Sequence, residues 1–165
     1  METPLSKPDR IPPAVEIEEL LTTLLDLDVE VKTITKVAYK ANDVCVLGLF
    51  KKEENHLGAV VVGDRYFANF IGASLSRMAA DSARRDIKNA MITDTMLENV
   101  EEVFTVFANN LNARGAPHLV LHQTRKDTIP LPGPLSKVVD VAPNRIDLQV
   151  AIPGYGKGTM TLALF

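Results

Sequence analysis

The fold of this chain is decided by residues 96–113, which read MLENVEEVFTVFANNLNA. Apolar side chains recur there at spacings of three and four residues, the period of an α-helix that buries one face. This face comprises Leu97, Val100, Phe104, Phe107 and Leu111. Because such a helix is stable only against another apolar surface, the segment predicts a helix that covers the core of a domain.

The opposite face of the same predicted helix is polar except at one position. Its polar residues, again at helical spacing, are Glu98, Glu102, Thr105, Asn109 and Asn112. Val106 interrupts the row between Glu102 and Asn109 and is expected to point toward solvent. A carboxylate, an apolar group and an amide in one exposed row are typical of a surface that meets a partner.

Size and composition indicate one ordinary globular domain. The chain has 165 residues, 46% of them hydrophobic and 24% charged, which suffices for a single core and argues against disorder. The net charge of −3, without a Lys/Arg run, does not favour a nucleic-acid partner. No apolar run approaches the roughly 18 residues of a membrane span, and residues 1–15 lack the order of a signal peptide. The sequence therefore predicts a cytoplasmic protein that does not enter a membrane.

The cysteine and the histidines give no sign of catalytic or metal chemistry. The one cysteine, Cys45, lies in an apolar run and allows no internal disulfide. His118 and His122 are expected on one strand with no carboxylate beside them, and His56 lies in a charged turn. The sequence therefore predicts no metal site and no cofactor of the protein's own.

Hydrophobic patterning along the rest of the chain predicts an α+β domain. A stripe of leucine and isoleucine indicates a helix over residues 14–27, and Asp64 is suited to cap a second helix that runs to residue 79. The two long central helices have one apolar face each, so they should cover a mostly antiparallel sheet, with the N-terminal helix beside them. Strands are expected over residues 29–39, 43–50, 56–62, 118–124, 136–141, 147–152 and 159–165.

Proline, cap and glycine signals set the boundaries. Four prolines mark residues 1–13 as a flexible leader, followed by a single domain over residues 14–165. Thr95 and Glu98 form a capping-box pattern that should start the helix quoted above. That helix is expected to end near Gly115.

This arrangement resembles the CheC/CheX/FliY family of bacterial chemotaxis phosphatases, from about residue 14 to residue 165. The family's signature is Asp or Ser, three residues, Glu, two residues, Asn, then twenty-two residues and Pro. Asn109 takes the Asn position and Pro132 the Pro position, whereas Glu102 replaces Asp or Ser and Val106 replaces Glu. Three further stretches are similar to the family, namely residues 57–62, 107–111 and 158–164.

The resemblance implies a CheX-like domain that docks on a response-regulator receiver domain such as CheY and hydrolyses its aspartyl phosphate. It gives the Asn109 amide the task of orienting the attacking water, while the receiver supplies a magnesium ion and the family's Glu pairs with a receiver lysine. An acyl phosphate is already activated, so positioning is the main task, and an amide performs it without titrating.

Val106 departs from this pattern because valine cannot pair with a lysine. Glu102 lies one helical turn earlier, about 6 Å along the axis, and is the candidate for the missing carboxylate. Asn109 and Glu102 are therefore the candidate catalytic residues. The expected partner-binding residues are Glu98, Thr105, Val106 and Asn112.

Three functions stay open at the level of sequence. The first is a CheX-like phosphatase with weak or altered activity. The second is a non-catalytic binding or scaffold module of the same family that keeps the docking face. The third is a structural dimerisation domain, in which the exposed valine and a sheet edge form a contact between two copies of the chain.

Overall fold

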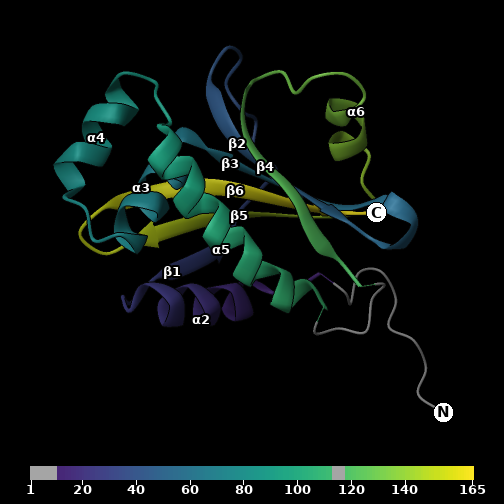
Figure 1. Ribbon diagram of the computed structural model, residues 1–165, viewed down its shortest axis with the longest axis horizontal. Coiled ribbons are helices and arrows are strands. Elements are labelled where there is room, and N and C mark those ends of the chain that lie inside the picture. The colour runs from purple at the N-terminus through teal and green to yellow at the C-terminus, as the bar shows by residue number, and fades with distance from the viewer. Residues whose placement is uncertain (1–10, 113–117) are drawn as a thin grey trace.

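The computed structural model describes residues 11–112 and 118–165 (Figure 1). Most of the expected leader, and the expected helix end near Gly115, lie outside these ranges. The helices are α2 (Ala14–Leu25), α3 (Arg65–Leu75), α4 (Ala80–Lys88), α5 (Asp94–Asn112) and α6 (Leu135–Asp140), with a short 3-10 turn at Glu53–Asn55. The strands are β1 (Glu30–Thr33), β2 (Val44–Lys51), β3 (Leu57–Asp64), β4 (Val120–Thr128), β5 (Asn144–Ile152) and β6 (Gly156–Leu164).

All the described strands join one antiparallel sheet in the order β1-β5-β6-β3-β2-β4. β2 and β3 form one hairpin, and β5 and β6 form another. The latter turns at Gly154, whose φ of 81° lies in the region that glycine adopts without strain. β1 and β4 are the two edge strands. The prediction of an α+β domain with a mostly antiparallel sheet is confirmed.

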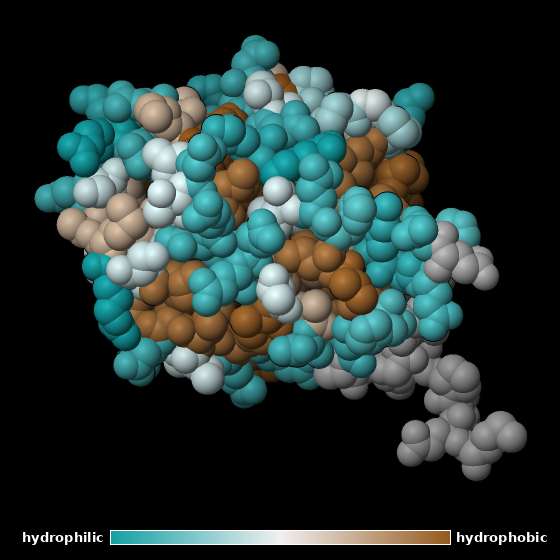
Figure 2. Space-filling view, viewed as in Figure 1, coloured by the Kyte–Doolittle hydropathy of each residue, from teal (hydrophilic) through white to brown (hydrophobic). Residues whose placement is uncertain are grey.

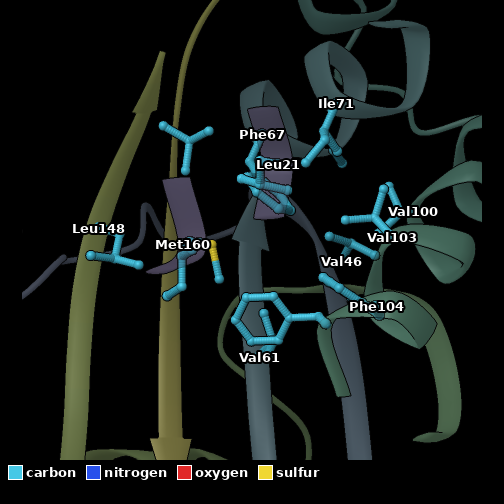
Figure 3. Close-up of a cluster of buried hydrophobic side chains, with 14 of the residues drawn as sticks. Leu21, Val46, Val61, Phe67, Ile71, Val100, Val103, Phe104, Leu148 and Met160 are labelled. Carbon is cyan, nitrogen blue, oxygen red and sulfur yellow. The ribbon is translucent and has the colours of Figure 1, made fainter. Parts of the chain in front are cut away.

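The helices α2, α3 and α5 cover one face of the sheet, and α5 crosses it diagonally in Figure 1. Figure 3 shows how the core forms where these helices meet the strands. Phe67 of α3 and Phe104 of α5 stack with ring centroids 6.4 Å apart, above the strand residues Val46, Val61 and Met160. The apolar face of α5 is therefore buried as the helical spacing predicted, except that Leu97 is half-buried.

The first turns of α3 and α5 are capped by side chains. Asp64 Oδ1 accepts a hydrogen bond of 2.7 Å from the Phe67 backbone N–H, which confirms the predicted cap of α3. For α5 the predicted capping box at Thr95 is wrong. The hydroxyl of Thr93 accepts from the Met96 N–H at 3.2 Å, so the helix starts two residues earlier and Thr95 lies within its first turn.

The opposite face of the sheet has a smaller core, which corrects one predicted strand. Residues 136–141 do not form a strand, because Leu135–Asp140 is α6. Its side chains Leu135 and Val139 are one turn apart and both pack on this face beside Cys45 and Leu47. Burial of this pair outweighs the strand preference of the valines in the segment.

The predicted strand over residues 29–39 is too long, since only Glu30–Thr33 pairs with β5. After Ile34, whose N–H donates to the Asp147 carbonyl, the chain leaves the sheet edge and crosses to the face that carries α6. Residues 34–43, here called the arm, are held there by Tyr39 and by the bond from Val37 N to the Asp147 carboxylate. Contacts between segments distant in sequence thus end β1.

Candidate functional site on helix α5

The outward face of α5 presents the polar row that the sequence predicted. Glu98, Glu102, Thr105 and Asn109 are exposed. Figure 2 shows that the front of the molecule, where α5 lies in Figure 1, has hydrophilic side chains next to hydrophobic patches. Asn109 lies three residues before the last residue of α5. No hydrogen bond joins its amide to any described residue, so the amide is available to a partner.

A shallow groove of about 320 Å³ runs between α5 and the edge strand β4. Thr105, Asn109 and Asn112 line its α5 side, and Gln123 and Thr124 of β4 line the other. The hydroxyl oxygen of Thr124 is buried without a hydrogen-bond partner among the described residues. Since Thr124 Oγ1 is closed to solvent, the exposed amide of Asn109 is a group that a partner in the groove can reach.

Three of the predicted residues lie outside this groove. Glu98, Glu102 and Val106 do not line it. Asn110, one turn after Val106, donates a hydrogen bond of 3.3 Å to the carbonyl of Glu16 in α2. Val106 is accordingly half-buried on the flank of α5 that turns toward α2, rather than fully in solvent as expected.

Asn112 and Thr105 already make hydrogen bonds within the protein. The Asn112 amide donates to the Leu119 carbonyl and accepts from the Leu119 N–H, both at 2.8 Å. The Thr105 hydroxyl donates to the Glu101 carbonyl at 2.8 Å, within its own helix. Asn112 thus ties the end of α5 to the start of β4, and Asn109 is the amide of this row that is left without such a bond.

The other candidate chemistries find little support. Among residues 11–112 and 118–165, no group of three or more His, Cys, Asp or Glu side chains is placed to hold a metal ion. His118 precedes β4 instead of sharing the strand with His122. Burial raises the pKa of Cys45 to about 12, so its thiol stays protonated at neutral pH and is a poor nucleophile. None of the described helices is long and apolar enough to cross a membrane.

The structure adds residues that the sequence reasoning missed. Glu101, Gln123 and Thr124 line the groove together with Asn109. The residues of β4 carry no local signal for this role, since they adjoin α5 only because β4 pairs with β2 at the sheet edge. Pro132, the last position of the family signature, lies before α6, and its neighbours Ile129 and Leu131 pack on the opposite face of the sheet.

The sequence matches no protein-family model and no curated protein. Solved structures match it over nearly its whole length. The FliM middle domain from H. pylori aligns with a TM-score of 0.60 and 11% identity over 92% of this chain and 84% of that chain. The CheX–CheY–BeF3–Mg2+ complex from Borrelia burgdorferi aligns with a TM-score of 0.58 and 15% identity over 93% of this chain and 99% of that chain. A CheC-like superfamily protein from Shewanella aligns with a TM-score of 0.55 and 14% identity over 97% of this chain and 99% of that chain.

The chain has the CheC/CheX/FliY-type fold. At 11–15% identity, these similarities show the fold alone. The chemistry of the site has to be argued from the residues of this chain. Within the CheC/CheX/FliY-type fold described here, α5 is a helix of 19 residues that keeps one face on the sheet and leaves the other open.

Proposed function

We propose that the outward face of α5 docks on a partner protein, and that this partner is a CheY-like receiver domain. The observation that carries the proposal is the Asn109 amide, which is exposed on a long helix and bonded to no described residue. A relative of the same fold has been solved as a CheX–CheY–BeF3–Mg2+ complex, which supports a receiver as the partner.

We further propose that the docked domain accelerates hydrolysis of the receiver's aspartyl phosphate, weakly or in an altered form. The Asn109 amide can hold a water molecule by donating one hydrogen bond and accepting another, and it stays neutral over the working pH range. The magnesium ion would come with the receiver and balance the charge of the phosphoryl group. Glu102 adds a carboxylate one turn before Val106, where it can meet a basic group of the partner.

The direct test is phosphate release from a panel of phosphorylated CheY-like receivers, timed with and without this protein. We expect phosphate release to be faster than the receiver's own decay. The Asn109→Ala variant should lower that acceleration by about 100-fold, while its affinity for the receiver in the BeF3–Mg2+ form changes little. Asn89→Ala is the matched control, because Asn89 is an exposed asparagine at the end of α4. Undiminished release by the Asn109→Ala variant would remove the amide from the mechanism.

A second candidate is a binding or scaffold module without turnover, and Val106 favours it. Its half-buried isopropyl group stands where the resembling family has a carboxylate, and FliM middle domains share the fold. This candidate predicts receiver binding with no faster phosphate release. The same assay, run beside a binding titration, separates the two.

A further inference from the structure

The face of the sheet opposite α5 holds a cavity of about 330 Å³ that the proposed function does not use. It lies between the arm, α6 and the strands β3 and β5. Its walls are mainly apolar, and they are formed by Val37, Ala38, Ile129, Leu131 and Val139. A cavity of this size with apolar walls and few polar groups is typical of sites for small organic molecules.

The hydroxyl group of Tyr39, at the edge of this cavity, is used in contacts within the protein. Its hydroxyl lies 2.7 Å from Thr161 Oγ1 and 3.3 Å from the Val62 carbonyl oxygen. The Thr161 hydroxyl donates to Asp147, so the Tyr39 hydroxyl is the donor in its contact with Thr161. Burial raises the pKa of Tyr39 and keeps the phenol neutral. The cavity therefore has no charge from this side.

Arg145 supplies the charge instead, and part of its guanidinium group is unused. Nε and Nη2 each donate to the Asp147 carboxylate at 3.0 Å. Among the residues that the structure describes, the third nitrogen, Nη1, pairs with Asp140 Oδ1 at 3.7 Å, which is too far for a hydrogen bond. The Arg145 side chain as a whole is 13% exposed, and it lines the cavity.

Asp140 is a weak competitor for this position. Its side chain is 60% exposed, and the same oxygen that faces Arg145 lies 3.9 Å from Lys36 Nζ. Loose, exposed ion pairs of this kind add little to stability, so Asp140 can move into solvent at small cost. With a ligand carboxylate in place of Asp140, the two cations Lys36 and Arg145 would again face two anions. These are the ligand carboxylate and Asp147.

We propose that this cavity binds a small organic acid, with an apolar ring or branched chain between the arm and α6 and a carboxylate that accepts hydrogen bonds from Arg145 Nη1 and Lys36. A charge-assisted bond to a guanidinium group shielded from water is a strong and directional contact. At roughly 30 Å³ per water molecule, the volume of 330 Å³ equals that of about ten waters, so a ligand of about ten non-hydrogen atoms would fill it.

The test uses the full chain and phenylacetate, followed by NMR. We expect a dissociation constant on the order of 1 mM or tighter, with shifted amide signals at Val37, Val139 and Arg145. Phenylacetamide, which has the same shape without the charge, should bind at least about tenfold more weakly because it cannot form the charge-assisted bonds. Equal binding of the two probes, or shifts confined to α5, would overturn the proposal.

Two variants sharpen this test. Asp140→Asn removes the competing carboxylate and should tighten phenylacetate binding, whereas Ser136→Trp should fill the cavity and abolish binding. Asn109→Ala, on the other face of the sheet, should leave the affinity unchanged. Weaker binding by Asp140→Asn, or full affinity in a folded Ser136→Trp variant, would contradict the assigned site.

Discussion

Val106 occupies a half-buried position on the α2 side of the α5 surface, one turn from Glu102 and three residues before Asn109. A glutamate there would extend past the flank of the helix into solvent, and it would add the carboxylate that the signature of the resembling family contains. We therefore expect Val106→Glu to raise the rate of phosphate release from a phosphorylated receiver by about tenfold, through charge pairing with the partner.

The control for this change is Val141→Glu, which adds the same carboxylate at a 76% exposed position next to α6. It should leave the release rate at the wild-type value. A folded Val106→Glu variant that releases phosphate no faster than wild type would count against the alignment of this helix with the family signature.

Asp147 contributes to the stability of the folded protein. Burial alone would raise the pKa of its carboxyl, but hydrogen bonds from Arg145, Thr161 and the Val37 N–H outweigh it, so the pKa lies below its ordinary value. Asp147→Asn leaves the Arg145 guanidinium without its carboxylate, and we expect a loss of about 3 kcal/mol in the free energy of unfolding at pH 7.

The pH dependence of that loss has a definite sign. A lowered pKa in the folded state means that the charged carboxylate adds stability above the unfolded value near 3.9, and that this stability disappears as the pH falls through the folded value. Urea unfolding at pH 7, 5 and 3 should show the gap between wild type and Asp147→Asn shrinking at the acidic end. A gap independent of pH would mean that the carboxylate charge is not what holds the arm.

At the scale of the element, the start of α5 can be tested by two adjacent threonines. The Thr93 hydroxyl caps the Met96 N–H, so Thr93→Ala should lower the free energy of unfolding by about 1 kcal/mol. Thr95→Ala is the matched control and should change it by less than about 0.5 kcal/mol, since its exposed side chain lies within the first turn. Chemical denaturation measures both, and the reverse order would restore the capping box that the sequence predicted.

At the scale of the whole molecule, the sheet should be most stable at its centre. β3 and β6 pair on both sides, lie between two apolar layers and are almost entirely buried. In hydrogen exchange, we expect their amides to exchange roughly 100-fold or more slowly than those on the outer edge of β4. Uniform exchange rates along the sheet would contradict this arrangement of central and edge strands.

Local sequence was sufficient for the elements that bury a regular pattern. The spacing of Val100, Phe104 and Phe107 defined α5, and the continuous apolar runs defined β2 and β3, because burial on one helix face or on both sheet faces leaves a readable period. The exposed amide of Asn109 followed from the same period. These features were determined by the order of residues alone.

Only the tertiary structure decided the rest. α6 forms because Leu135 and Val139 meet a second small core, β1 ends because Asp147 captures the arm, and the groove beside Asn109 exists because β4 pairs at the edge of the sheet. Each depends on contacts between segments tens of residues apart, for which the chain has no local period. The energy of such contacts is set by where the backbone brings surfaces together, and a sequence read residue by residue does not contain that geometry.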